Sequence, residues 1–276
     1  MPTRRSLILI IFLFAISNTA YAQPRSELAA VQSCVRPWLA GVDTVIAATA
    51  SHPRNRELQT YRRILANSSY AEPYFDPQGR PGLRFLSEVP NEREPWVVIM
   101  PFCRQDRLRA DYAETGFIAS YSDTYKTLMI DTVTELPPVI RGLYLIHEMR
   151  HFAQSQSEPL RDDNPQTHLR HEVDAFEVEF SVLDALRLPG YDRWLRTEVA
   201  RMRDDINNAR STTLLATDSQ FDIMLPELSQ DKRARDLVAS LFFIRALFKS
   251  YDEQFSPQES LSHKLGLMNQ LYPQRT

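Results

Sequence analysis

The feature that most constrains this chain is the segment His147-Glu148-Met149-Arg150-His151, which lies within an apolar stretch. On a helix, two residues four apart project from the same face, about one turn from each other. His147 and His151 can therefore direct both imidazoles at one tetrahedral zinc ion, at nitrogen–zinc distances of about 2.0–2.1 Å. Glu148 lies between them, where a carboxylate can take a proton from a zinc-activated water and return it to a leaving amine. The pattern predicts a helix that carries a catalytic zinc site.

The residues around this segment indicate that its helix is buried. Leu143, Leu145 and Ile146 precede the motif, and Phe152 and Ala153 follow it, so the helix is apolar on nearly all sides. Two imidazoles and a carboxylate are costly in such surroundings unless something satisfies them. A metal ion would do so. The alternative is a core helix whose histidines only form hydrogen bonds with the backbone or with carboxylates.

A catalytic zinc needs a third protein ligand and an open position for water. In the next expected helix, Glu172 and Glu179 fall within the apolar stripe, whereas Asp174 lies off it, where a solvated carboxylate is expected. A carboxylate inside an apolar stripe needs a partner, and a zinc ion on the neighbouring helix would be one. Glu172 is therefore the predicted third ligand, with His168 and His171 as alternatives. Glu179 is expected either to orient a zinc-bound imidazole or to pair with an arginine.

The pattern along the chain predicts an α+β fold, in which a small antiparallel sheet precedes a predominantly helical half. We expect two helical pieces within 25–67 and strands at 83–86, 96–100, 116–121 and 127–131, the last two forming a hairpin. Further helices are expected at 138–155, 165–188, 190–209, 231–250 and 258–270, with Asn164-Pro165 as a start signal and Pro189-Gly190 as a stop signal. The division is 1–22, 23–136 and 137–276, and the last two parts form one continuous domain.

The first twenty-two residues are typical of a secretory signal. Arg4 and Arg5 precede an apolar run at 7–16, which is too short for a permanent membrane span. Ala20-Tyr21-Ala22 then places small residues at the −3 and −1 positions of a cleavage site. We expect cleavage after Ala22, a periplasmic or secreted protein, and no stable membrane insertion afterwards, because no later segment is apolar enough.

The two cysteines, Cys34 and Cys103, both follow this segment. In an oxidising compartment, such a pair without metal-site spacing is expected to form a disulfide. Closing a loop of this length would stabilise the fold by about 4 kcal/mol in the chain-entropy description.

Charge and glycine content exclude other classes of function. The net charge of −3 argues against a nucleic-acid partner. The chain has only 7 glycines and no phosphate-cradling glycine loop, which disfavours nucleotide binding.

The segment 147–151, followed by a helix bearing Glu172-Val173-Asp174-Ala175, resembles the zincin metallopeptidases of the gluzincin type. More closely, it resembles small metallopeptidases of bacterial envelopes, and the resemblance covers residues 138–186. It implies a minimal zincin-like core, with zinc held by the two histidines and a downstream glutamate and with Glu148 as the general base. It also implies a strand edge beside the cleft, where an extended peptide docks through main-chain hydrogen bonds. The hairpin at 116–131 is the expected edge.

The chain departs from longer patterns of this group. The glycine and third histidine that follow a metzincin motif are absent after His151, and Phe176 stands where the thermolysin-like pattern places an aspartate. Enzymes of this kind also stabilise an oxyanion with a Tyr, His or Arg side chain. Tyr144, Tyr191 and His263 are the candidates.

The sequence thus predicts an exported zinc metallopeptidase that acts on a peptide or protein substrate. One alternative is a zincin-like envelope scaffold or binding protein without catalysis. Another is a zinc amidase that acts on cell-wall material with the same residues. The role of residues 23–110 stays open between a lid, a pro-segment and a structural half.

Overall fold

The computed structural model describes residues 33–66, 71–75, 81–85, 97–102, 118–123, 127–132, 134–157, 164–214, 218–228 and 230–272. The expected signal segment 1–22 and Cys103 lie outside these residues. Signal cleavage and the Cys34–Cys103 disulfide therefore stay predictions.

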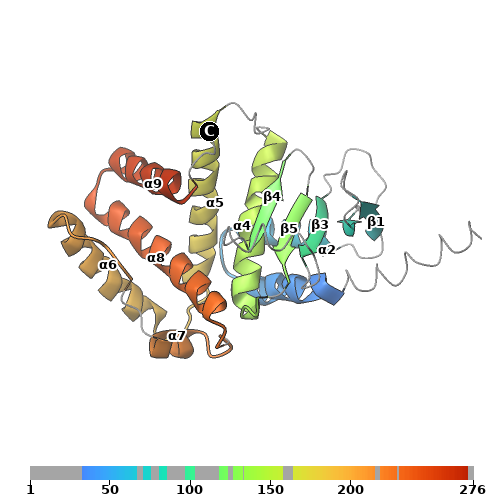
Figure 1. The fold of residues 1–276 in the computed structure, drawn as a ribbon, viewed down its shortest axis with the longest axis horizontal. Helices are drawn as coiled ribbons and strands as arrows, with labels where there is room; N and C mark the ends of the chain where they lie inside the picture. The colour runs from blue at the N-terminus through green and yellow to red at the C-terminus, as the bar shows by residue number, and fades with distance from the viewer. Residues whose placement is uncertain are drawn as a thin grey trace, which may run out of the picture.

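Two long helices, α4 (Pro138–Ser157) and α5 (Pro165–Ala185), lie side by side in the middle of the molecule. They separate a sheet from a group of C-terminal helices, as Figure 1 shows. The strand β4 packs against α4 on one side, and α9 packs against α5 on the other. Whatever lies between α4 and α5 is therefore enclosed by both halves of the fold.

The sheet has five strands in the order β1-β2-β3-β5-β4. The strands are β1 (Ala71–Phe75), β2 (Pro81–Phe85), β3 (Val97–Phe102), β4 (Ala119–Ser122) and β5 (Thr127–Asp131). The expected hairpin is confirmed, because β4 and β5 pair antiparallel from Ala119 opposite Ile130 to Ser122 opposite Thr127. β4 is consequently the terminal strand of the sheet, next to α4.

The sheet differs from the expectation in one pairing. β3 and β5 run parallel, from Val98 opposite Thr127 to Phe102 opposite Asp131, whereas the other pairs are antiparallel. β4 lies between β3 and β5 in sequence but outside β5 in space, so β5 returns in the direction of β3. Strand order of this kind depends on tertiary packing and leaves no trace in the local hydrophobic pattern.

The helical half confirms the predominantly helical α+β class. The N-terminal helices span 33–48 and α2 (Asn55–Ala66). After α5 come α6 (Tyr191–Asn207), the short α7 (Asp218–Met224), α8 (Lys232–Gln254) and α9 (Pro257–Leu271). None of the helices in the described ranges combines the length and apolar character that crossing a membrane requires.

Local signals explain where α5 begins and ends. The side chain of Asn164 accepts hydrogen bonds from the backbone N–H groups of Gln166 and Thr167, at 3.1 and 3.3 Å, and Pro165 occupies the first turn. The helix ends at Ala185, before the expected Pro189-Gly190 stop, and Arg187 then takes a left-handed φ of 51°. The start of α5 is thus fixed by its cap, two turns before Glu172.

The helix at 33–48 crosses α4 at a pair of glycines. A Cβ placed on Gly41 would lie 2.5 Å from the carbonyl oxygen of Pro138 and 2.8 Å from the backbone nitrogen of Gly142. A Cβ on Gly142 would overlap the carbonyl oxygen of Gly41. The two backbones are therefore in direct contact, which only glycine permits. This contact holds the N-terminal helix against the helix that carries the histidine motif.

The core continues through α4, α5 and α8. The rings of Phe180 and Phe248 meet edge to face, with centroids 5.4 Å apart, and Phe176 stacks on Phe180. The ring of His147 lies against Phe176, with centroids 4.5 Å apart. The apolar stripe of α5 therefore reaches the imidazole of α4, and the histidine motif lies at the edge of the core.

Candidate metal centre

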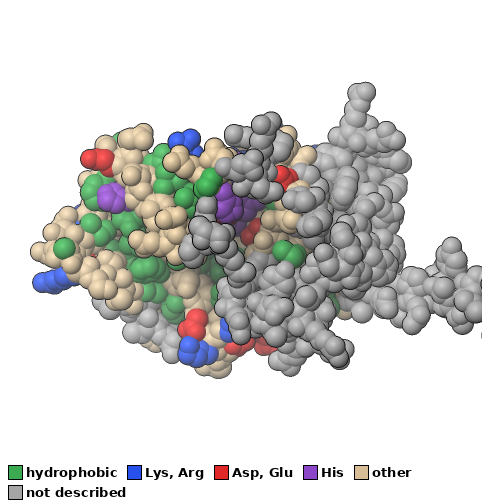
Figure 2. Space-filling model, turned by 45° about the horizontal axis from the view of Figure 1, so that its top comes forward, with side chains coloured by type: hydrophobic (Ala, Val, Ile, Leu, Met, Phe, Trp, Pro, Cys, Tyr) green, Lys and Arg blue, Asp and Glu red, His purple; other side chains and the backbone are tan. Residues whose placement is uncertain are grey.

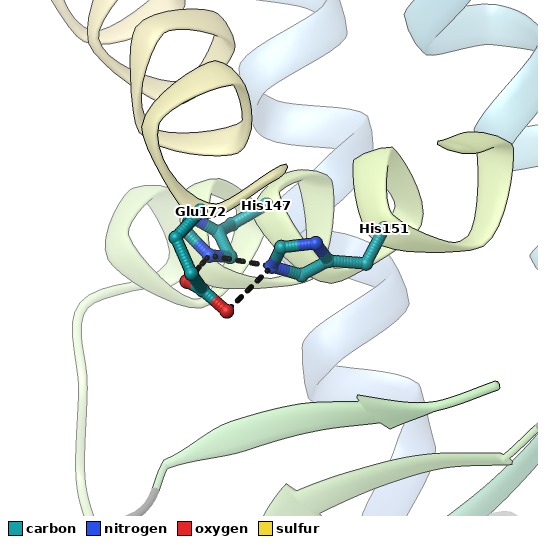
Figure 3. Close-up of side chains that lie close together, drawn as sticks. All are labelled: His147, His151 and Glu172. Atoms are coloured by element: carbon teal, nitrogen blue, oxygen red, sulfur yellow. Dashed lines mark hydrogen bonds and ion pairs between the residues drawn. The ribbon is translucent and has the colours of Figure 1, made fainter. Parts of the chain in front are cut away.

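The structure brings together His147 and His151 of α4 and Glu172 of α5 (Figure 3). All three residues are buried, and one ligand atom from each lies within 4.8 Å of the others. The two Nε2 atoms are 3.2 Å apart. The Glu172 carboxylate lies 3.5 Å from Nε2 of His147 and 3.4 Å from Nε2 of His151. This buried group can hold a metal ion, and it consists of the three residues that the sequence selected.

His147 is supported from behind by Glu179. Its Nδ1 lies 3.0 Å from Oε2 of Glu179, and the Glu179 side chain is fully buried. Nδ1 of His147 can donate to this carboxylate, so in the neutral imidazole Nε2 carries the lone pair. Glu179 was expected to play this part or to pair with an arginine, and its partner in the structure is the imidazole.

His151 is supported by a residue that sequence reasoning missed. Its Nδ1 lies 3.0 Å from Oε1 of Gln154, one turn further along α4. The amide of Gln154 donates in turn to Oδ2 of Asp174, at 2.6 Å, and to the backbone carbonyl of His171, at 3.2 Å. Asp174 is thus paired across the helix interface, while its side chain stays 37% exposed, as its place off the apolar stripe indicated.

The centre of the group is a cluster of acceptors. With both Nδ1 atoms donating outward, Nε2 of His147, Nε2 of His151 and the Glu172 oxygens all present lone pairs to one another. Acceptors at 3.2–3.5 Å repel unless a cation lies among them. Protons on the imidazoles or a metal ion both meet this need. The residues present therefore fit a bound cation.

The pKa values reflect the same arrangement. Burial alone would lower the pKa of His147, but hydrogen bonds to Glu172 and Glu179 outweigh it and raise this pKa well above 6.5. Burial alone would likewise lower the pKa of His151, but the neighbouring Glu172 carboxylate outweighs burial, so this pKa is raised as well. Burial would raise the pKa of Glu172, yet the imidazoles of His151 and His147 lower it. The site therefore attracts positive charge.

Glu148 lies beside the trio and does not belong to it. It is buried, and burial raises the pKa of its carboxyl above the usual value despite the two neighbouring imidazoles. Its carboxylate accepts a hydrogen bond from the backbone N–H of Tyr121 in β4. The terminal strand of the sheet therefore holds the group that was predicted to act as the general base.

The two alternative ligands lie nearby. Nε2 of His168 is 3.7 Å from Oε1 of Glu172, and its side chain is 44% exposed, so it borders the site from the solvent side. His171 contributes its backbone carbonyl to Gln154. Glu172, rather than either histidine, supplies the third atom of the buried group.

The three groups proposed for oxyanion stabilisation have other contacts. The hydroxyl of Tyr144 donates to the carbonyl of Leu237 at 3.4 Å, and that of Tyr191 donates to Asp184 at 3.0 Å. The ring of His263 packs on Phe255, with centroids 4.3 Å apart. All three are therefore engaged within the helical half.

Tyr272, at the end of α9, was not among the candidates. Burial, with the charges of Glu172, Glu148 and Glu179, raises the pKa of its phenol well above the ordinary value. The residue is nevertheless 40% exposed, so part of its ring faces solvent. Figure 1 shows the end of α9 approaching α5. No sequence pattern marks this tyrosine, because it follows the last helix by one residue.

The ligand residues are themselves buried, with His147, His151 and Glu172 only 5–7% exposed. In Figure 2, histidine side chains are visible near the middle of the surface, with acidic side chains close by.

Comparison with protein-family models, with curated proteins and with solved structures found no match for this chain. The geometry of the site itself must therefore carry any functional conclusion.

Proposed function

We propose that this protein is an exported zinc-dependent hydrolase of peptide bonds. The observation that carries the proposal is the spacing of the three ligand atoms. Atoms bound to one tetrahedral zinc at about 2.0–2.1 Å lie about 3.3–3.4 Å from each other. Nε2 of His147 and Nε2 of His151 are 3.2 Å apart, and each lies at a similar distance from one of the two Glu172 oxygens, 3.5 Å from Oε2 for His147 and 3.4 Å from Oε1 for His151. Two imidazoles and one carboxylate are also a donor set used by catalytic zinc.

The proposed chemistry divides between the metal and Glu148. When bound, zinc supplies a Lewis acid that polarises a carbonyl group and acidifies water. Glu148 takes the proton of the attacking water and delivers it to the leaving nitrogen. Its raised pKa suits both halves of this transfer, because a carboxyl that titrates closer to neutrality accepts and releases a proton more evenly.

The place of the substrate follows from the hydrogen bond between β4 and Glu148. β4 is terminal in the sheet order, and the N–H of Tyr121 points toward the Glu148 carboxylate. An extended peptide that pairs with the outer edge of β4 would lie beside this carboxylate. The main chain of β4 would then align the scissile bond with the metal centre.

Tyr272 is the proposed donor to the oxyanion. Its phenol stays protonated because burial and three carboxylates raise its pKa, so it can donate a hydrogen bond at any physiological pH. Such a donor strengthens its bond as negative charge develops on the carbonyl oxygen.

The test compares zinc content with hydrolysis of fluorescein-labelled casein and of a quenched-fluorescent peptide mixture. Glu148→Gln should keep about one equivalent of zinc and lose at least about 10²-fold in rate, since proton transfer is removed while the ligands remain. Tyr272→Phe should also keep zinc and lose about 10²-fold in kcat. Glu177→Gln, an exposed carboxylate paired with Lys264, serves as the control and should cleave as the parent does. Undiminished cleavage by Glu148→Gln would overturn the mechanism.

A further inference from the structure

The hydrogen bond from His151 does not end at Gln154. An amide has an acceptor end and a donor end, so a contact at one end fixes the orientation of the other. Nε2 of Gln154 contacts Oδ2 of Asp174 and the carbonyl of His171, and both can only accept. The oxygen of Gln154 must therefore face His151, whose Nδ1 donates to it at 3.0 Å. In the neutral imidazole, this leaves the lone pair on Nε2, toward the centre.

Asp174 is itself held in place by Arg150. Nε of Arg150 donates to the same Oδ2 of Asp174 at 2.7 Å. The guanidinium is planar and rigid, so its second contact is fixed along with the first. That contact runs from Nη1 to Oε1 of Glu57 at 3.2 Å, and Glu57 belongs to α2.

Glu57 is anchored within its own helix. Its Oε1 also accepts a hydrogen bond from the hydroxyl of Tyr61, and its Oε2 accepts one from Arg54 at 2.9 Å. Tyr61 is buried, so the anchor is part of the packing of α2. A continuous chain of polar contacts therefore joins the N-terminal helices to an imidazole of the metal centre.

We propose that Glu57, Arg150, Asp174 and Gln154 form a positioning relay, through which α2 sets the orientation and tautomer of His151 for metal binding. The relay rests on the metal-binding part of the proposed function and is independent of hydrolysis. It makes α2 a part of the metal centre. A lid or a removable pro-segment would have no such role.

Metal affinity tests the relay directly. The probes are Co²⁺, followed by its visible absorption, and Zn²⁺ in competition with a chromophoric chelator. Gln154→Met and Asp174→Asn should each weaken binding by about 10–100-fold, the usual effect of removing a group that orients a ligating histidine. Glu57→Gln should weaken it by less than about tenfold, because the Glu57–Arg150 pair is partly exposed and Arg150, Asp174 and Gln154 all lie between Glu57 and the imidazole.

A matched control lies on the same helix. Arg62 of α2 pairs with Asp43 in the helix at 33–48, through contacts of 2.6 and 2.9 Å, and neither residue belongs to the relay. Asp43→Asn removes an ion pair from the N-terminal helices without interrupting the relay. It should leave the metal affinity within about twofold of the parent.

A rescue experiment separates positioning from simple destabilisation. Gln154→Glu alone places a second carboxylate against Asp174 and should weaken binding. In Gln154→Glu combined with Asp174→Asn, the amide at position 174 can donate to the carboxylate at position 154, which again accepts from His151. The double variant should bind Co²⁺ at least tenfold more tightly than Gln154→Glu, roughly the effect of one restored orienting contact. A loss of packing alone would instead accumulate in the double variant.

The outcomes distinguish the relay from the function on which it rests. If the parent binds neither Co²⁺ nor Zn²⁺, the metal centre itself is wrong. If the parent binds metal while Gln154→Met and Asp174→Asn bind it equally well, the relay is wrong. Weaker binding by these variants supports the relay even when the protein cleaves none of the peptide probes. Near-ultraviolet circular dichroism checks the fold of each variant. The metal affinity of Glu57→Gln tests the relay at a partly exposed residue, where the substitution disturbs the packing least.

Discussion

The two sides of the metal centre hold their imidazoles in different ways. His147 rests on one carboxylate, Glu179, which is fully buried. His151 rests on a neutral amide, Gln154, which gains its orientation from charged side chains that are 26–37% exposed. A buried charge acts over a short distance and is little screened by salt, whereas exposed pairs are weak singly and depend on one another. One side is thus local, and the other reaches across three helices.

Glu172 is shared by both sides, so its loss should have the largest effect. In Glu172→Ala both Nε2 atoms lose the carboxylate that lies 3.4–3.5 Å away. We expect zinc below about a tenth of an equivalent after dialysis, measured by elemental analysis. His168→Ala is the control, because its exposed imidazole lies 3.7 Å from Glu172 on the solvent side. Equal zinc loss from both variants would show that the third ligand is not Glu172 alone.

Glu179→Gln should have the next largest effect, and it acts on one side only. The variant keeps an acceptor for Nδ1 of His147 but removes a buried charge. Zinc affinity should fall by about 100-fold, toward the upper end for such supporting groups, and the loss should be similar at low and high salt. Competition titrations with a chelator give the affinities. The comparison fails if this variant binds zinc as the parent does, or if its loss shrinks in high salt as that of Asp174→Asn should.

The smallest effect concerns pH. Without metal, His147 and His151 have raised pKa values in the fold, so their bound protons stabilise it. This contribution is complete below about pH 6.5, the unfolded value, and is lost as pH rises through the raised pKa values. Zinc competes with these protons, so stabilisation by zinc grows over the same window.

Thermal unfolding with a chelator and with zinc should therefore give opposite slopes above pH 6.5. The midpoint of the metal-free protein should fall, and that of the zinc-loaded protein should rise. Replacing either His147 or His151 with alanine should flatten both curves, because each imidazole has a raised pKa. Parallel curves would mean that the imidazoles do not bind the ion.

The sequence was sufficient for the parts of the site that one helix determines. The four-residue spacing of His147 and His151 and the place of Glu172 and Glu179 in an apolar stripe all follow from helical periodicity, and the structure confirms that these residues lie together. The α+β class and the β4–β5 hairpin were predicted on similarly local grounds.

What the sequence missed depends on contacts between elements. Gln154 and Asp174 acquire their roles only when α4 and α5 lie at a particular rotation, which no periodicity records. Tyr272 was not a candidate because its place depends on how α9 packs against α5. The strand β1 was not predicted, because its segment contains Pro73 and shows no alternating pattern. The parallel pairing of β3 with β5 was not predicted either, because it depends on the order of the strands in the sheet.

The backbone contact between Gly41 and Gly142 has a consequence for engineering this protein. A Cβ at either position would overlap main-chain atoms, which cannot turn aside as a side chain can. In a library that randomises the chain, both positions should reject even alanine, although neither residue touches the metal or carries a functional group. Mutational tolerance will thus not track distance from the chemistry. We expect the lowest tolerance at two places, namely the metal ligands and the contact between Gly41 and Gly142, where the backbones of two helices meet directly.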